Sequence, residues 1–413
     1  MPVSWSGDDL VVICGGNHFR GEKKMHDVHL AEHLASHARV LYVDPPVSHL
    51  TPRRRPELAA MLEHPRLRLI GDSLAQLTPV VAPKPLSAPV VRSTEVLVRR
   101  AIVHAVRRLG ANPAAIISAW PFLDVFDACP DARKVYWWTD DPASAADLWR
   151  MNRARLVAGD RRIAARSDLV IAVSERAVER FRAEGLDARF FPNGCDADTM
   201  ALTDVVPVAP DVRLPAPVAG FVGHLNARTD LSLLEGVAAS GMSLLMVGPC
   251  VPGFEPERMA ALCACPHVAW VGSRPFDQIP AYLGHVDVGL VPYADTEFNR
   301  SSFPLKALEY LAAGRPVVST GLPGIRWLAT DQIVVADTPS AFAEAVARSV
   351  AGARDPIAME RRRAFAGGHS WTERAWVLAS LLGLGGDAAA RSPRPTLIAP
   401  HPNPAAYAER SRS

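Results

Sequence analysis

The chain has 413 residues and a mass of 44.6 kDa, so the usual size of domains predicts two or three of them. Hydrophobic residues make up 49% and charged residues 21%, which is typical of a globular protein and excludes wholesale disorder. Lys and Arg number 45 against 43 Asp and Glu, and the formal net charge of +2 is too balanced for a protein that coats nucleic acid. We therefore expect no nucleic-acid partner.

The cysteines and the N-terminus favour a cytoplasmic protein. The six cysteines are scattered, and only Cys263 and Cys265 are close in sequence, so we expect reduced thiols and no structural zinc. Met1 leads into acidic Asp8-Asp9 without a basic region, which argues against a signal peptide. No run of about eighteen apolar residues predicts a transmembrane helix. Any membrane contact should be peripheral, at the inner face.

Short β-branched runs alternate with helical patterns along the first half of the chain. A strand over 10–14 ends in Gly15-Gly16 and precedes a helical pattern over 25–35. Helical patterns also cover 90–109 and 143–165, and further strands are predicted at 39–44, 67–70, 115–118, 135–138, 169–173 and 189–191. This alternation predicts a doubly wound α/β domain with a parallel sheet, which we place at residues 1–201.

The segment 202–217 carries four prolines, which can continue neither a helix nor a central strand, so we expect a linker. A second doubly wound domain then follows over 218–385, with a last helix at 371–383 that can pack back on the first domain. Residues 386–413 predict a disordered tail. The strands of the second domain are predicted at 218–222, 243–247, 268–271, 286–291, 316–319 and 332–335, and its helices at 230–239, 340–350 and 356–365. We expect the two domains to face a cleft, with ligands at the carboxyl ends of the strands.

The most informative stretch is 299–318. Ser301 or Ser302 can cap a helix, Pro304 suits its first turn and Gly314 suits its end. The free N–H groups and the positive dipole end of such a helix favour a phosphate group.

Two charged residues on this helix predict a ligand. Lys306 adds a positive charge to the first turn, and Glu309 lies on the same face because the two residues are three apart. A carboxylate there can accept hydrogen bonds from a diol such as ribose. The alternative is an exposed ion pair on an ordinary helix, worth about 0.2–0.5 kcal/mol.

The block Phe303–Val318 closely resembles the donor-binding helix of GT-B glycosyltransferases, in the family-4-like superfamily that uses nucleotide sugars. The resemblance extends over most of the chain. Segments 219–225, 268–272 and 287–292 resemble strands of the C-terminal domain, and 174–176 with 192–196 resemble the end of the N-terminal domain. Pro304-Leu305-Lys306 is similar to the branch of exopolysaccharide and teichuronic-acid-type transferases, some of which invert configuration.

The resemblance implies that the N-terminal domain binds the acceptor and that the C-terminal domain binds a UDP- or GDP-linked sugar, without a cofactor. Glu309 would hold the ribose hydroxyls and Lys306 the diphosphate, the latter together with the N–H groups near Pro304 and Leu305. The loop around Ser273 and Arg274 would contact the base through backbone groups. The remaining donor-binding positions would be Gly15, Gly16, Gly223, Arg228 and Ser301.

Some positions depart from the family pattern. Ser301 stands where many retaining members have a second glutamate. Of the usual basic pair after the first C-terminal strand, His224 takes one place and Arg228 lies near the other. These changes leave the sugar and the anomeric outcome open.

An inverting transferase needs a general base, whereas a retaining one depends on stabilising the departing diphosphate. Asp140 and Asp141 follow the strand 135–138, and adjacent like charges can raise one pKa, but Asp141 is equally suited to cap the next helix. Their spacing is not the D-x-D of metal-dependent transferases, so we expect no metal. Of the histidines His18, His26 and His29, we single out His26, and we hypothesise that Asp141 or His26 handles the acceptor proton.

Residues 51–108 contain eleven basic and four acidic residues, and 90–108 predict an amphipathic helix with a basic face. Such a helix can rest on an anionic membrane surface, which suits a lipid-linked acceptor. The alternative is an ordinary helix with a solvated basic side.

The sequence therefore predicts a glycosyltransferase that acts on a glycan, a lipid-linked or a small-molecule acceptor. A nucleotide-sugar epimerase and a non-catalytic GT-B scaffold in polysaccharide assembly are the alternatives. A dinucleotide-dependent oxidoreductase is disfavoured, because no G-x-G-x-x-G follows a predicted strand.

Overall fold

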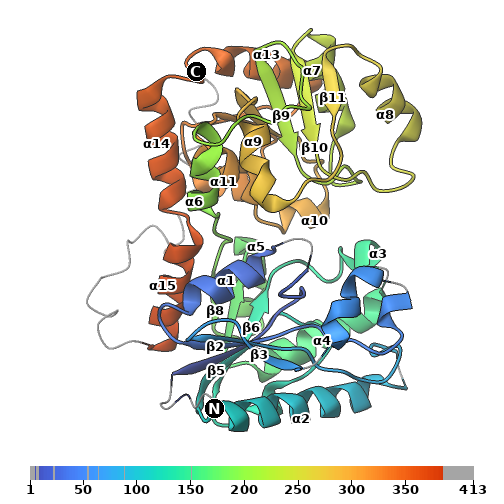
Figure 1. Cartoon of the computed structure of the whole chain (residues 1–413), viewed down its shortest axis with the longest axis vertical. Helices are drawn as coiled ribbons and strands as arrows, with labels where there is room; N and C mark the ends of the chain where they lie inside the picture. The colour runs from blue at the N-terminus through green and yellow to red at the C-terminus, as the bar shows by residue number, and fades with distance from the viewer. Residues whose placement is uncertain are drawn as a thin grey trace. The chain divides into compact units, whose positions relative to one another are not determined.

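A computed structural model describes residues 5, 9–21, 24–53, 55–63, 65–87, 89–149 and 151–384. The chain divides into two compact units (Figure 1). The first unit runs up to Gly16, continues through Leu34–Pro192 and takes up the chain again from Trp376. The second holds Asn17–His33 and Asn193–Ala375. Helices α1 (His26–Leu34) and α15 (Trp371–Leu382) therefore each begin in the second unit and end in the first.

The first unit is built on an eight-stranded sheet of order β3-β4-β2-β1-β5-β6-β7-β8. All neighbours are parallel except β3 and β4. The strands are β1 (Leu10–Cys14), β2 (Arg39–Val43), β3 (Leu67–Leu69), β4 (Leu74–Leu77), β5 (Pro113–Ser118), β6 (Arg133–Trp138), β7 (Leu169–Ala172) and β8 (Ala188–Phe190). Its helices are α2 (Val91–Leu109), α3 (Ala146–Trp149), α4 (Arg153–Arg166) and α5 (Glu175–Ala183).

The prediction of a doubly wound first domain is confirmed, but β4 is a strand that the sequence does not predict. Its four residues are all buried, and they include the polar Gln76. The Gln76 amide donates to the Asp44 carboxylate at 2.7 Å, and the Thr78 hydroxyl donates to the same carboxylate at 2.6 Å. Asp44 directly follows β2, the neighbour of β4 in the sheet, so the buried Gln76 amide has a hydrogen-bond partner.

The second unit holds a six-stranded parallel sheet of order β11-β10-β9-β12-β13-β14. Counted within the unit this is the 3-2-1-4-5-6 order of dinucleotide-binding folds, whose ligands lie where the strand order reverses, here between β9 and β12. The strands are β9 (Val218–Val222), β10 (Ser243–Val247), β11 (Val268–Trp270), β12 (Val288–Val291), β13 (Val317–Ser319) and β14 (Ile333–Val335). The helices are α6 (Ala197–Ala201), α7 (Leu231–Ala239), α8 (Pro256–Cys263), α9 (Ile279–Leu283), α10 (Glu297–Arg300), α11 (Leu305–Ala312), α12 (Pro323–Leu328), α13 (Pro339–Val350) and α14 (Pro356–Gly367).

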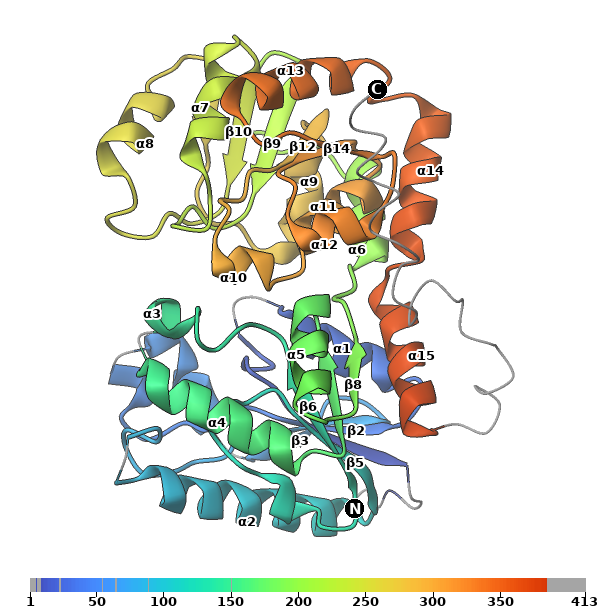
Figure 2. The same cartoon turned by 180° about the vertical axis from the view of Figure 1, so that it is seen from behind.

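Helices cover both faces of this second sheet. Val288 and Leu290 of β12 pack in one core cluster with residues of α7 and α13, which lie side by side over the sheet (Figure 1). Gly289, between them, faces the opposite side because successive residues of a strand alternate. A Cβ at Gly289 would lie 2.3 Å from the Tyr310 ring of α11. Helix α11 therefore covers the other face, next to α6 (Figure 2).

The structure differs from the predicted domain boundaries at the proline-rich segment. Residues 202–217 lie within the second unit and are bound to it. Asp204 pairs with Arg315 at 2.7 Å and also with Arg363, and Asp211 pairs with Arg274 at 2.8 Å. These ion pairs are the physical reason why a segment that looks like a linker belongs to a domain.

The end of α15 belongs to the first unit, where the Arg133 side chain donates to the Leu381 carbonyl at 2.6 Å. The predicted tail over 386–413 lies outside the described residues. Among the helices that the structure describes, none combines the length and the hydrophobicity that a bilayer span requires.

The packing of Tyr310 against Gly289 gives the first testable prediction. Gly289→Ala should lower the free energy of unfolding by about 2–3 kcal/mol, because the added methyl group would overlap the Tyr310 ring. Gly367→Ala in α14 is the control, since a Cβ there meets nothing within 4 Å, and it should be neutral or stabilising by up to about 1 kcal/mol. Urea unfolding measures both, and equal stability of the two variants would contradict this packing.

Candidate functional site

The strand order of the second unit reverses between β9 and β12, and the loops after these two strands are bonded to each other. The Asp230 amide donates to the Pro292 carbonyl at 2.8 Å, and the Ala294 amide donates to the Arg228 carbonyl at 2.9 Å. Thr229 and Tyr293 form a short antiparallel bridge between the same loops. The loop that contains Gly223, His224 and Arg228 is therefore fixed at the position where this fold binds ligands.

Three glycines follow the adjacent strands β9, β10 and β11. The Gly223 amide donates to the Val247 carbonyl at 2.9 Å, and the Gly248 amide donates to the Gly272 carbonyl at 2.8 Å. Gly248 has φ of +137°, and a Cβ there would lie 1.9 Å from the Gly223 carbonyl oxygen. Our sequence reasoning singled out Gly223 and missed Gly248. The signal was a Val-Gly pair that recurs at the end of each strand, at 222–223, 247–248 and 271–272.

Arg228 is held next to the segment that carries Ser301. Its Nε donates to the Asn299 Oδ1 at 2.8 Å, and a terminal nitrogen donates to the Ser302 hydroxyl at 3.3 Å. The guanidinium carbon lies 4.5 Å from the centre of the Phe298 ring. Asn299 is buried, and it was missed by the sequence analysis. The structure thus brings Arg228 to the side of Ser302, as a positive charge with a fixed orientation.

The predicted cap of the donor helix is wrong. Helix α11 begins at Leu305 with Pro304 at its N-cap, and neither Ser301 nor Ser302 caps it. Ser301 instead ends the short helix α10, whose own cap is the Thr296 side chain. The local Ser-Ser-x-Pro pattern could not show this, because α10 takes up the residues just before it. The predicted end at Gly314 is confirmed, with φ of +78° and its amide bonded to the Leu311 carbonyl.

Lys306 and Glu309 form an ion pair in which the Nζ and Oε2 atoms are 2.6 Å apart. The ion pair that the alternative interpretation expected is therefore present, but it is not exposed to solvent. The Lys306 side chain is 27% exposed and the Glu309 side chain only 7%. The second carboxylate oxygen, Glu309 Oε1, has no hydrogen-bond partner in the part of the chain that the structure describes. A nearly buried carboxylate thus uses only half of its accepting capacity.

Tyr310 fixes the orientation of α11. Its hydroxyl accepts a hydrogen bond of 2.7 Å from the Val222 amide at the end of β9, and its ring lies over Gly289 of β12. Glu309, the preceding residue, reaches the neighbourhood of Cys195. Burial raises the pKa of the Cys195 thiol, and the negative charge of Glu309 raises it further.

In the predicted base-contacting loop, the Arg274 side chain is already bonded to other residues. The Arg274 side chain pairs with Asp211, bonds to Tyr282 and donates to the Ser273 carbonyl at 3.0 Å. The guanidinium is thereby committed to holding the segment near 211. This is compatible with the expectation that the loop contacts a base through backbone groups.

In the first unit, Gly15 is required by packing. A Cβ there would lie 2.0 Å from the Tyr42 hydroxyl, and the Gly15 carbonyl accepts a 2.6 Å hydrogen bond from the Trp120 indole. Gly16, the next residue, is exposed. The size of Gly15 therefore has a structural explanation that needs no ligand.

Asp141 forms an Asx-type turn before α3, which begins at Ala146, and it does not cap that helix itself. Its carboxylate accepts from the amides of Ala143 at 3.1 Å and Ser144 at 3.2 Å, and its carbonyl accepts from the Ala145 amide. His26 is the first residue of α1 and is half-buried. The two candidate bases belong to different units, Asp141 to the first and His26 to the second.

Two other histidines of the second unit, the buried His29 and the half-buried His369, have lowered pKa values. His29 stacks on Trp371 with ring centres 5.9 Å apart, and burial lowers its pKa to about 3. The His369 ring accepts from the Arg374 guanidinium at 3.0 Å. Burial, and then the positive charge of Arg374, lower the pKa of His369 to about 3. No local sequence signal marks His369, whose environment comes from the fold.

The half-buried His369 makes the stability of the protein depend on pH. In the unfolded chain the pKa of His369 is near the ordinary value of about 6.5. Below that pH the unfolded state binds a proton at His369, whereas the folded state stays unprotonated there. The contribution of His369 to the free energy of unfolding is therefore complete above about pH 6.5. It falls as the pH drops toward 3, and about 2 kcal/mol is lost at pH 5.

His369→Asn keeps an acceptor for Arg374 but removes the titration, so the loss between pH 7 and pH 5 should shrink by that amount. Urea unfolding at the two pH values measures it, with the exposed His104→Asn as control. A loss as large in His369→Asn as in the unchanged protein would refute this explanation.

Comparisons with known proteins agree with this geometry. Residues 216–351 match the family model described as "Glycosyl transferases group 1". TuaH of Bacillus subtilis, described as a teichuronic acid biosynthesis glycosyltransferase, is 30% identical over 159 residues. That match spans 37% of this chain and 40% of the length of TuaH.

Solved structures resemble almost the whole chain. Sucrose-phosphate synthase of Thermosynechococcus elongatus superposes with a TM-score of 0.67 at 16% identity, covering 91% of this chain and 98% of its own. HepE of Anabaena, solved with UDP and glucose, gives 0.62 at 13% identity, covering 91% and 99%. The chain therefore has the GT-B fold, and residues 216–351 of its second unit are similar to the glycosyl transferases group 1 family.

Proposed function

We propose that this protein is a glycosyltransferase, which moves a sugar from a nucleoside diphosphate to a glycan, a lipid-linked or a small-molecule acceptor without a metal or cofactor. The family match of residues 216–351 and the similarity to TuaH support sugar transfer. The related fold of HepE, solved with UDP-glucose, supports a UDP-linked donor as the first to test and a GDP-linked one as the second.

One observation carries the proposal: the buried Glu309 carboxylate with an open oxygen. A buried carboxylate normally has all its accepting positions filled, because leaving one empty costs stability. In Glu309, whose side chain is 7% exposed, Oε2 pairs with Lys306 and Oε1 has no hydrogen-bond partner among the described residues. A vicinal diol supplies two O–H donors, so the ribose of a nucleotide can satisfy this oxygen.

The same helix can hold the diphosphate. The positive dipole end of α11 and the Lys306 ammonium both favour a negative charge, whereas the Leu305 amide already donates to the Phe303 carbonyl at 2.9 Å. Arg228, held by Asn299 and Ser302, supplies a second cation beside this segment. Positive charges in fixed positions stabilise a departing diphosphate without reorganisation, which is the main demand of glycosyl transfer.

For the acceptor proton we propose His26 before Asp141, because the Asp141 carboxylate already accepts two backbone hydrogen bonds. Each is tested by replacement with Asn: loss of transfer with donor binding retained identifies the base, and full turnover of both variants excludes both.

We also propose a cytoplasmic, peripheral location, in which α2 contacts anionic lipid. On this helix Val96 is 43% and Leu97 40% exposed, and Arg92, Arg100, Arg107 and Arg108 are exposed as well. Exposed apolar side chains among basic ones favour an anionic surface, whereas an ordinary solvated helix remains the alternative. Sedimentation with anionic vesicles at low salt distinguishes the two.

The proposal predicts that UDP, UDP-glucose or a GDP-linked sugar raises the melting temperature of the protein, because a ligand that binds only the folded state stabilises it. Glu309→Gln and Lys306→Ala should each weaken donor binding at least about tenfold, since each removes a charge-assisted hydrogen bond. Calorimetric titration measures the affinities.

The control is Glu344→Gln in α13, which alters an exposed ion pair of the same unit and should leave donor binding unchanged. Donor binding by Glu309→Gln as tight as that of the unchanged protein would contradict the site. Product analysis separates the alternatives: transfer to an acceptor supports the transferase, isomerised donor an epimerase, and neither transfer nor hydrolysis a scaffold.

A further inference from the structure

The first unit contains a cavity of about 490 Å³, and none of the residues that line it belongs to the donor site described above. Its volume falls within the range of about 300–1,000 Å³ that is usual for small-molecule sites. The lining residues come from three segments of the chain, and they are Leu86, Val91, Phe122, Met151, Asn152, Arg155, Leu156, Ala158, Gly159 and Arg162.

These segments meet because each follows a strand of the parallel part of the sheet. Leu86 and Val91 come after β4, Phe122 comes after β5, and the residues of α4 come after β6. Parallel strands end at the same edge of the sheet, which is where doubly wound folds bind ligands. The cavity therefore lies among the segments that follow the carboxyl ends of β4, β5 and β6.

The walls of the cavity are mostly apolar, with Leu86, Val91, Phe122, Met151 and Leu156 among them. Gly159 lets α4 approach the segment that carries Phe122, because a Cβ there would lie 2.0 Å from the Pro121 carbonyl oxygen. The body of the cavity thus suits a hydrocarbon chain.

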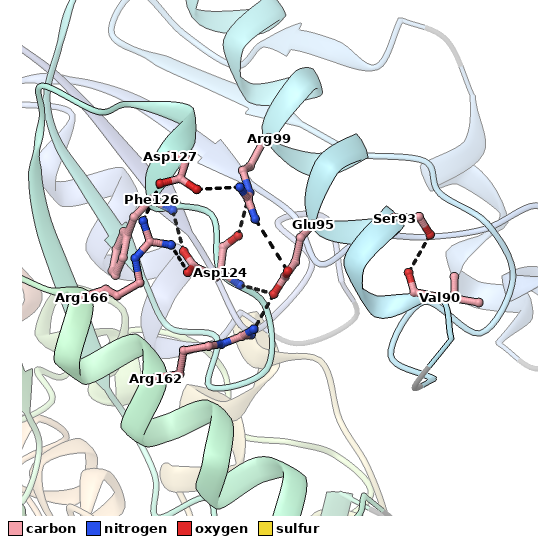
Figure 3. Close-up of polar contacts among 9 residues, drawn as sticks. All are labelled: Val90, Ser93, Glu95, Arg99, Asp124, Phe126, Asp127, Arg162 and Arg166. Atoms are coloured by element: carbon pink, nitrogen blue, oxygen red, sulfur yellow. Dashed lines mark hydrogen bonds and ion pairs between the residues drawn. The ribbon is translucent and has the colours of Figure 1, made fainter.

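One wall is fixed by a network of ion pairs. Glu95 of α2 accepts from Arg162 at 2.8 Å and from the Asp124 amide at 3.0 Å, and it lies 3.7 Å from Arg99 (Figure 3). Arg166 pairs with Asp124 and Asp127 (Figure 3). Three arginines and three carboxylates balance one another and join α2 to α4, so Arg162 is held in place at the cavity.

Arg155 adds a charge that nothing balances. Across the residues that the structure describes, its guanidinium has no ion-pair partner, and no carboxylate is among the lining residues. Arg155, Ala158 and Arg162 are spaced at three and four residues, so they share one face of α4. The cavity therefore combines an apolar body with net positive charge on one wall.

We propose that this cavity binds a single lipid phosphate, with the hydrocarbon chain between Phe122 and Leu156 and the phosphate on Arg155 and Arg162. The inference rests on the proposed function in one respect, because it selects a lipid-linked acceptor among the three classes left open above. Arginine suits the phosphate because its planar group donates two parallel hydrogen bonds.

The test uses the full chain and decyl phosphate, added as monomers below its micelle concentration, with calorimetric titration as the readout. Decanol has the hydrocarbon chain without the phosphate, and inorganic phosphate lacks the chain. Each should bind at least about tenfold more weakly than decyl phosphate. Shortening the chain from decyl to octyl should weaken binding by about fourfold for each methylene removed.

Two pairs of variants locate the ligand. Ala158→Trp fills the cavity from an exposed position of α4 and should abolish binding, whereas Ala165→Trp, exposed on the same helix outside the cavity, should not. Arg155→Gln should weaken decyl phosphate at least about tenfold and leave decanol unchanged. Arg161→Gln, also exposed on α4, is its matched control.

Absence of decyl phosphate binding, equal binding of decanol, or binding that survives Ala158→Trp would each overturn the inference, the last by showing adsorption elsewhere on the surface. UDP binding is measured on the same samples. UDP binding without decyl phosphate binding overturns this inference alone, whereas decyl phosphate binding without any nucleotide binding contradicts the proposed function alone.

Discussion

The hydrogen bond from the Val222 amide to the Tyr310 hydroxyl ties helix α11 to the end of β9, at the point where the strand order of the second sheet reverses. Gly289 of β12 makes this contact possible, because a side chain at that position would overlap the Tyr310 ring. The residue before Tyr310 is Glu309, so this contact determines where the Glu309 carboxylate lies. Burying that carboxylate with a single lysine partner costs stability, which an apolar residue of similar size would not. A buried carboxylate that lowers stability, at the edge of a sheet where this fold binds ligands, is typical of a binding site.

Both units place their candidate sites by the same constraint. Parallel strands all end at one edge, so the loops that follow them converge without any single loop being long. In the second unit this edge collects three Val-Gly turns and two cations, which suits a diphosphate. In the first unit it collects apolar side chains and Arg155, which suits a chain with an anionic end. The two proposed ligands differ because different side chains follow the strands of the two sheets.

Much of this architecture could be predicted from the sequence. The apolar run Leu10–Cys14, the recurring Val-Gly pairs and Gly314 are local signals, and each corresponds to a strand or a helix end in the structure. The pairing of Lys306 with Glu309 also follows from local spacing. The predicted serine cap of α11 was wrong, because Ser301 instead ends the short helix α10, which is capped by Thr296.

Other features depend on residues far apart in the chain and could not be predicted. Glu95 and Arg162 are separated by 67 residues, and Gln76 is separated by 32 from the Asp44 that makes its burial tolerable. The segment 202–217 looked like a linker because the arginines that bind Asp204, among them Arg315 and Arg363, follow more than a hundred residues later. Periodicity in one sequence shows which faces are apolar, but it does not show which charges meet.

The most direct test of the account removes the ribose hydroxyls and the carboxylate in turn. Affinities are measured for UDP and 2′,3′-dideoxy-UDP (or the GDP pair, if guanine is preferred) with the unchanged protein and with Glu309→Gln. If the open oxygen of Glu309 accepts from ribose, the unchanged protein should lose at least about tenfold for the dideoxy nucleotide, and Glu309→Gln should lose much less. Equal losses in both proteins would show that Glu309 does not touch the ribose.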